Sequence, residues 1–189
     1  MKAEAGRRTV RCDVIEDAGR HFVDMSRYYV GSDYLPKIRR CLAALPEEDL
    51  WWRPNDSSNS VGNLLLHLSG NIRQWIVSGV GGRADIRERW KEFTADGAGE
   101  GGGRDSGALL TYLEETLADV DEVLAGLSPD DLLRRTVIQG QEVTLLEGVL
   151  HAVEHFSMHT GQIIYVTKLR TGADLRFYEV EGGIARKNW

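Results

Sequence analysis

Apolar residues recur every three or four positions along most of the chain, which is the pattern of amphipathic helices. The strict alternation that is typical of strands is nearly absent before the C-terminal end. A first helical region is predicted from about 14 to 45. We expect it to break near Gly31, because Gly31, Ser32 and Asp33 offer a new helix start and Pro36 falls in the following first turn.

A second helix is predicted from Ser60, a capping residue, to about Gly79, and it carries His67 among its apolar positions. A third helix is expected at about 108–127. These two segments share the apolar stripe of helices that pack into a core.

The last helix opens with a capping box, in which Thr144 is the cap and Glu147 stands three residues later. It is expected to run to about Arg170 and to end at Gly172. Four long helices predict an all-α protein with a four-helix bundle in a single domain. That domain spans 1–189 with a core at about 14–172. Between the long helices we expect a short helix within 83–93, a flexible glycine-rich loop at 94–107, a helical turn after Ser128 and a break at 139–141. A short extended tail is expected at 176–181.

Charge and composition narrow the class of protein. The chain has 189 residues, a net charge of -6 and a pI of about 5.4, which argues against a nucleic-acid binder. It has no apolar run of about 20 residues for a bilayer and no secretory signal, so we expect a cytoplasmic protein. Cys12 and Cys41 lie far apart and are interpreted as reduced thiols, with a disulfide between them as the less favoured alternative.

Three of the five histidines fall within nine residues of the last helix, at His151, His155 and His159. Residues four apart lie on one face of a helix, with Cβ atoms about 5–6 Å apart. Two imidazoles at that spacing can bind one metal ion. The pattern therefore indicates a metal site, although such a pair also occurs as surface or structural residues.

A third ligand is needed, and both His151 and His67 are candidates. Three ligands on one helix fan out over two turns, so a small ion does not easily reach all of them. A ligand from a facing helix solves this problem, which favours His67 with His155 and His159. The alternative for His67 is a buried histidine bonded to a backbone carbonyl.

Two other patterns have alternative readings. His151, Glu154 and His155 match the H-x-x-E-H signature of inverted zinc proteases, but the short remaining chain offers no further ligand domain or peptide cleft. Arginines near Trp90, at Arg83, Arg87 and Arg89, suit either an anionic substrate or an ordinary solvated face.

Three stretches taken in order resemble one family. They are Leu50-Trp51-Trp52-Arg53-Pro54, the segment 59–71 with His67-Leu-Ser-Gly-Asn71, and His155-x-x-x-His159-Thr-Gly-Gln162. This set is similar to the DinB-like, or YfiT-like, superfamily, in a branch of unknown function. The resemblance covers about 28–169.

The resemblance implies a four-helix bundle that binds a divalent metal, usually zinc or nickel, through three histidines. Here these are His67, His155 and His159. Relatives are often homodimers, and they include thiol S-transferases that use bacillithiol or mycothiol and a mycothiol-dependent maleylpyruvate isomerase. The chain departs from many members at Met158, where they carry a second adjacent histidine, and at Thr160, which is often arginine.

We therefore expect a metal-dependent transferase or hydrolase of small molecules, with a thiol S-transferase as the form that fits the resemblance. Such an ion lowers the pKa of bound water or of a bound thiol, and either product is a nucleophile. Asn71, His151 and Gln162 are candidates to orient ligands or bound water. No carboxylate is placed by spacing as a general base. The alternative is a non-enzymatic metal-binding or stress-related bundle.

Overall fold

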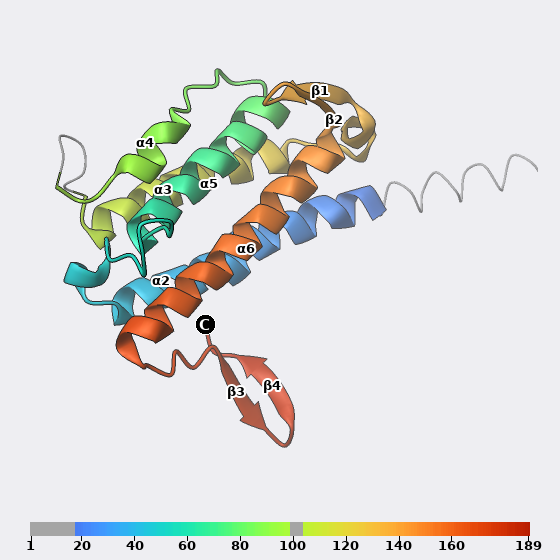
Figure 1. Cartoon of the computed structure of the whole chain (residues 1–189). Helices are drawn as coiled ribbons and strands as arrows, with labels where there is room; N and C mark the ends of the chain where they lie inside the picture. The colour runs from blue at the N-terminus through green and yellow to red at the C-terminus, as the bar shows by residue number, and fades with distance from the viewer. Residues whose placement is uncertain (1–17, 99–103) are drawn as a thin grey trace, which may run out of the picture.

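The computed structural model describes residues 18–98 and 104–189. They are mostly helical, and four long helical stretches pack side by side with one further short helix (Figure 1). The long stretches are residues 18–44, which include η1 (Tyr28–Tyr34) and α2 (Leu35–Ala44), then α3 (Val61–Ile72) continued by η3 (Arg73–Val80), α5 (Ser106–Ala125) and α6 (Leu145–Thr171). The predicted predominance of helix is confirmed.

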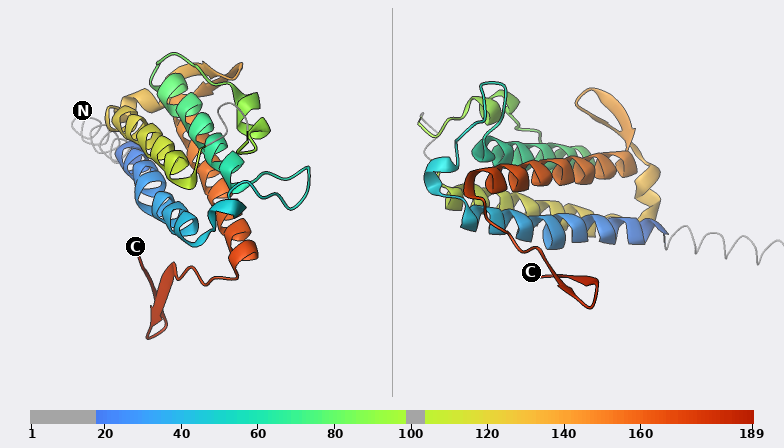
Figure 2. Two further views of the ribbon diagram at one scale, coloured as in Figure 1. Left: turned by 90° about the vertical axis from the view of Figure 1, so that its left-hand side faces the viewer. Right: turned by 60° about the horizontal axis from the view of Figure 1, so that its bottom comes forward.

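The helices enclose one apolar core. Helix α3 packs against both α5 and α6, and α2 packs against α6 (Figure 2). Large apolar side chains from all four stretches are almost fully buried, among them Ile38, Leu65, Leu113 and Phe156. The contact between α3 and α6 is the one that brings the candidate histidines together.

Helix ends largely follow the predicted signals. Ser60 caps α3 by accepting from the Asn63 backbone N–H, and the Asn63 side chain accepts from the Ser60 backbone N–H in return. Thr144 and Glu147 form the predicted capping box of α6. Gly172 ends α6 with a φ of 64°, a left-handed conformation that glycine adopts without strain.

The predicted break near Gly31 is confirmed in part, because η1 interrupts the α-helical geometry there and α2 starts at Leu35 with Pro36 in its first turn. Residues 18–44 continue as one helical stretch, which widens to π-helical geometry in η1. Pro36 has no N–H for the Ser32 carbonyl, its partner in an α-helix. Trp189 Nε1 donates to that carbonyl at 2.9 Å instead, so a contact from the far end of the chain supports the helix at this point.

Two β-hairpins accompany the helices. The break expected at 139–141 is the turn between β1 (Arg135–Ile138) and β2 (Gln141–Thr144), which pair antiparallel. Its turn residues both have positive φ, 52° at Gln139 and 77° at Gly140. The extended tail is longer than predicted, with β3 (Tyr178–Glu181) paired to β4 (Ile184–Lys187) in a hairpin that projects from the helices (Figure 1).

Shorter elements complete the chain. Helix α4 (Arg89–Thr94) is the short helix expected within 83–93, and the turns η2 (Glu47–Asp49) and η4 (Pro129–Leu133) flank the long helices. Part of the predicted glycine-rich loop, residues 99–103, lies outside the described residues, as does Cys12.

Cys41 is buried, which raises the pKa of its thiol to about 11. None of the described helices combines the length and the apolarity needed to cross a membrane.

Candidate metal centre

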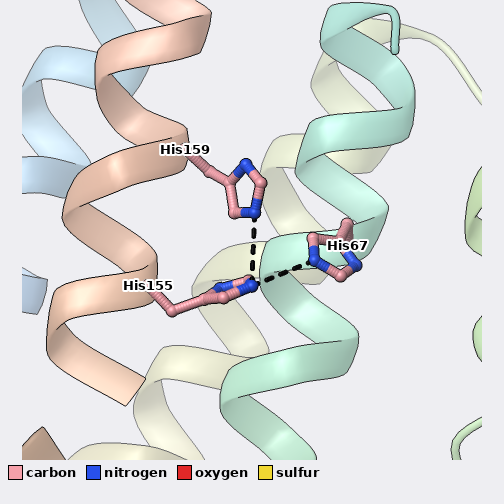
Figure 3. A group of neighbouring side chains, drawn as sticks. All are labelled: His67, His155 and His159. Atoms are coloured by element: carbon pink, nitrogen blue, oxygen red, sulfur yellow. Dashed lines mark hydrogen bonds between the residues drawn. The ribbon is translucent and has the colours of Figure 1, made fainter. Parts of the chain in front are cut away.

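Three imidazole rings converge between α3 and α6 (Figure 3). The Nε2 atom of His155 lies 3.2 Å from Nε2 of His67 and 3.2 Å from Nε2 of His159. His67 is 4% exposed and His159 is 8% exposed, while His155 is half-buried. The structure thus brings together the trio that spacing favoured.

The register of two helices produces this arrangement. His155 and His159 are one turn apart on α6 and point the same way, toward His67 on α3 (Figure 3). Capping boxes define where both helices begin, and buried residues on both sides of the histidines hold the helices together. The rings are therefore placed by rigid elements.

A buried carboxylate holds the far side of the His67 ring. Glu92 Oε2 lies 2.9 Å from His67 Nδ1, and Glu92 is 7% exposed. Arg87 forms two hydrogen bonds to the same carboxylate, at 2.7 and 2.8 Å, through a side chain that is 4% exposed. Burial alone raises the pKa of Glu92, but bonds from Arg87 and His67 outweigh it and hold the pKa below its usual value.

These contacts assign the tautomer of His67. Arg87 Nη2 also lies 3.1 Å from Nδ1, so Nδ1 is within hydrogen-bond distance of an acceptor, the Glu92 carboxylate, and of a donor, the Arg87 guanidinium. An ionised carboxylate at 2.9 Å requires Nδ1 to carry the proton, because two acceptors at that distance repel each other. The Nε2 lone pair of His67 is then free and faces His155.

Backbone contacts place Glu92 beside α3. The Asn63 side chain donates to the carbonyls of Glu92 and Ala95, at 3.0 and 2.7 Å. Arg53 donates to the same stretch, at the Ala95 carbonyl. A Cβ at Gly70 of α3 would lie only 2.0 Å from Glu92 Oε1, so glycine is needed there for the carboxylate to approach.

His159 has a corresponding partner in Gln162, one of the predicted orienting residues. Gln162 Oε1 lies 2.6 Å from His159 Nδ1, which places the proton on Nδ1 and leaves Nε2 as a free lone pair. Burial lowers the pKa of His159, although the bond to Gln162 acts in the opposite direction. The ring is therefore neutral near pH 7.

His155 stands between the other two rings. Burial, together with the neighbouring rings of His159 and His67, lowers its pKa to about 3. Its Nδ1 atom is buried and has no hydrogen-bond partner within the described residues. One proton on Nε2 of His155 can satisfy only one of the two lone pairs at 3.2 Å, whereas a cation between the three rings satisfies all of them.

The donor set fits a small divalent cation. Tetrahedral zinc with Zn–N bonds of about 2.0–2.1 Å places its nitrogen ligands about 3.3 Å apart. The two Nε2–Nε2 distances of 3.2 Å are close to that value, and the three donor atoms lie within 4.8 Å of one another. Metal-binding histidines also characteristically donate their second N–H to a carboxylate or carbonyl, as His67 and His159 do here.

Other residues considered from the sequence lie outside the converging group. The His151 ring packs against Trp75 at a tilt of 37°, with ring centroids 3.9 Å apart, and is not one of the three clustered donors. Glu154 is exposed, so the H-x-x-E-H reading gains no support. Asn71 is buried, and within the described residues it makes no hydrogen bond to the clustered histidines.

Glu92 and Arg87 are the site residues that the sequence did not identify. Arg87 was considered only as part of an arginine cluster, and the structure separates that cluster: Arg83 pairs with Asp119, whereas Arg87 pairs with Glu92. In the sequence, Glu92 follows shortly after the arginine cluster of Arg83, Arg87 and Arg89. Nothing in its spacing connects it with His67, which is 25 residues away.

Comparison with known proteins assigns a family. The model of the family described as "Protein of unknown function (DUF1572)" matches residues 17–183, which is most of the chain. The comparison with curated proteins finds no match. The matched range includes α3, α4 and α6 and therefore all three clustered histidines and Glu92. The chain belongs to the DUF1572 family of proteins of unknown function.

Proposed function

We propose that His67, His155 and His159 bind one divalent metal ion, with zinc or nickel as the expected metals, in a DinB-like four-helix bundle. The observation that carries the proposal is the convergence of the Nε2 atoms of three histidine rings. In two of these rings, His67 and His159, the Nδ1 proton is bound by Glu92 and by Gln162 respectively. A structural zinc site usually has four protein ligands. Three ligands leave an open position, which is typical of a catalytic site.

We propose further that the protein is a metal-dependent transferase or hydrolase of small molecules. An ion held by three neutral imidazoles supplies undiminished positive charge, which lowers the pKa of a coordinated water or thiol. Burial lowers the pKa of His155 and of His159, and Glu92 and Gln162 fix the orientation of the His67 and His159 rings. Arg87 balances the charge of Glu92, so the buried carboxylate stays ionised.

A thiol S-transferase is the form of this activity that agrees with the resemblance to DinB-like proteins. In that reaction the thiol sulfur attacks an electrophilic carbon, the thiol proton passes to solvent, and the leaving group departs with its electron pair. The partner is then a low-molecular-weight thiol together with a small electrophile. The homodimer expected from the resemblance stays a prediction, and light scattering is its test.

One observation favours a non-enzymatic metal-binding protein as the second candidate. Glu92, the carboxylate bonded to the histidine cluster, is committed to Arg87 and lies on the Nδ1 side of His67. It therefore does not face the position where a substrate would react. A bundle whose ion is structural or sensory needs no such base.

Thiol binding to cobalt-substituted protein tests the proposal. Cobalt(II) takes the place of zinc, and 2-mercaptoethanol is added under argon at neutral pH. We expect a new sulfur-to-cobalt charge-transfer absorption, because an open position accepts the thiolate. A spectrum that does not change at one bound cobalt per chain would contradict the open position and favour the second candidate.

A further inference from the structure

Helix α6 presents a row of side chains to solvent along most of its length. Its middle crosses the front of the molecule in Figure 1, with no other element drawn before it. Six exposed residues recur there at intervals of three or four, so they share one face of the helix. We call this face the outer stripe of α6, and its members are Leu150, Glu154, Met158, Gly161, Tyr165 and Lys168.

Large apolar side chains on and beside the outer stripe are open to solvent. Leu150, Met158 and Leu169 are each about half exposed, and Tyr165 is 68% exposed. The solvent face of an amphipathic helix normally carries polar and charged residues. An apolar patch that is rimmed by polar residues is typical of a surface that binds another protein.

The outer stripe is separate from the histidine cluster. His155 and His159 each follow a member of the stripe by one position, which turns them about 100° around the helix axis. They point toward His67 on α3 (Figure 3). A partner that lies on the stripe therefore does not need to contact a proposed metal ligand.

Gly161 forms the centre of the stripe and has no side chain. Outside its own helix backbone, no described atom lies within 4 Å of the position that a Cβ would occupy. Larger side chains stand on both sides of it, at Met158 and Tyr165. The surface of the stripe is therefore lowest at its centre, where a second helix can approach it.

The charges of the stripe are placed symmetrically about Gly161. Glu154 lies seven residues before it and Lys168 seven residues after it. Both are exposed, and no ion pair within the described residues includes either of them. Their charges are therefore available to a partner.

This symmetry fits a second copy of α6 that runs antiparallel to the first. If the two helices cross at Gly161, each Glu154 lies opposite the Lys168 of the other copy, so opposite charges meet twice. The same register places Tyr165, the largest side chain of the stripe, opposite the small Ser157. A parallel pair would instead place each Glu154 against another Glu154, and like charges repel.

We propose that the outer stripe of α6 is an interface between two copies of this chain, with the two α6 helices antiparallel about a two-fold axis at Gly161. Such an axis requires a self-complementary surface, and each copy supplies both the acidic and the basic partner. A groove of about 510 Å³ borders the stripe and is lined in part by Met158, Gly161 and Tyr165. The second copy covers this groove.

Charge reversal tests the interface. Sedimentation equilibrium measures the dissociation constant of the dimer on metal-free protein, so that the result does not depend on whether the histidines bind a metal. Glu154→Lys and Lys168→Glu should each raise this constant by at least about ten-fold, because each variant opposes like charges. The double variant exchanges the two charges and should return the constant to within about three-fold of the native value.

Glu115→Lys is the matched control for these variants. Glu115 is exposed on α5, outside the stripe, and the substitution makes the same change of charge. It should form dimers as native protein does.

Disulfide crosslinking in a Cys12→Ser background tests the direction of the helices. Gly161→Cys should crosslink two chains, because the two-fold axis brings this position against itself. Glu154→Cys alone should not, because its two copies are about 21 Å apart in an antiparallel pair at 1.5 Å per residue. Glu154→Cys combined with Lys168→Cys should crosslink again.

Three results would overturn the inference. Native protein that stays monomeric at high micromolar concentration would leave the stripe to a partner other than this chain. A native dimer whose dissociation constant neither single reversal changes would have its interface elsewhere. Crosslinking of Glu154→Cys alone would show a parallel pair.

Discussion

His67 depends for its orientation on residues from another part of the chain. Glu92 accepts the Nδ1 proton, and Arg87 holds both oxygens of that carboxylate. A histidine whose Nδ1–H is bound in this way presents Nε2 to a metal in one fixed orientation. The three histidines alone therefore do not explain the site.

Glu92→Gln tests this role. The substitution keeps an oxygen acceptor but removes its charge, and we expect metal affinity to fall by about 10- to 100-fold. Competition with a chromophoric chelator measures the change. Unchanged affinity in a folded variant would show that the contact does not orient His67.

A double variant separates orientation from stability. Glu92→Gln leaves Arg87 buried without its counter-charge, which costs about 3–5 kcal/mol when a buried pair is broken. Adding Arg87→Gln removes that charge, so the free energy of unfolding should recover in part. Metal affinity should stay low, because the acceptor is still neutral.

At this scale the sequence predicted the histidines and missed their support. His155 and His159 are spaced to share one face of a helix, and His67 lies on the apolar face of another helix, so local patterns predict the cluster. Glu92 reaches His67 through the irregular stretch before α4 and through bonds from Asn63. Such contacts depend on tertiary packing, so no local period encodes them.

At the scale of elements, α3 carries a glycine that the site requires. Gly70→Ala would place its Cβ 2.0 Å from Glu92 Oε1, and Arg87 prevents the carboxylate from moving away freely. We expect the variant to lose both stability and metal affinity, although helix propensity alone predicts a gain of about 1 kcal/mol. Thermal melts of Gly70→Ala beside Gly161→Ala measure the contrast, because a Cβ at Gly161 of α6 would meet no described atom within 4 Å outside its own helix backbone. A stabilised Gly70→Ala would mean that Glu92 does not need this close approach.

The same scale shows where sequence patterns are dependable. Side-chain caps such as Thr144 with Glu147 lie within one turn, so the start of α6 was predicted correctly. The β1–β2 hairpin was missed because its turn places Gln139, a non-glycine residue, at positive φ. The continuity of the first helical stretch was missed, and one of its contacts at this point, from Trp189 to the Ser32 carbonyl, comes from the far end of the chain.

The C-terminal hairpin is tied to η1 by a charged cluster. Asp33 is 4% exposed and pairs with Lys37 at 2.5 Å and with Lys187 of β4. Burial raises the pKa of Asp33, but the bonds from Lys187 and Lys37 outweigh it and hold the pKa below its usual value. A carboxyl with a depressed folded-state pKa stabilises the fold above its unfolded pKa, and this stabilisation disappears as the pH falls through the folded pKa.

We therefore expect acid to weaken the fold partly through Asp33. Asp33→Asn should lower the free energy of unfolding at pH 7 by about 3 kcal/mol, near the lower end for breaking a buried pair. Below the folded pKa of Asp33 the difference from native protein should shrink. Urea titrations from pH 7 to pH 3 measure both effects, and a difference that does not depend on pH would contradict the assignment.

At the scale of the whole molecule, we expect the core to fold without a metal. Large apolar side chains from all four helical stretches fill it, and the histidine cluster contributes little apolar area. We expect protein stripped with a chelator to stay helical and to unfold cooperatively. Zinc at about 100 times its Kd should then add about 2.7 kcal/mol of stability, or about 5–10 °C in Tm. A stripped chain with the circular dichroism of an unfolded protein would contradict this view.

The metal content of tag-free protein tests the central claim most directly. Elemental analysis should find one divalent ion per chain in the native protein and none in His155→Ala. His151→Ala is the matched control, because His151 lies on the same helix outside the cluster, and it should keep its ion. The account would be contradicted if native protein bound no metal after incubation with zinc or nickel, or if His151→Ala lost the ion while His155→Ala kept it.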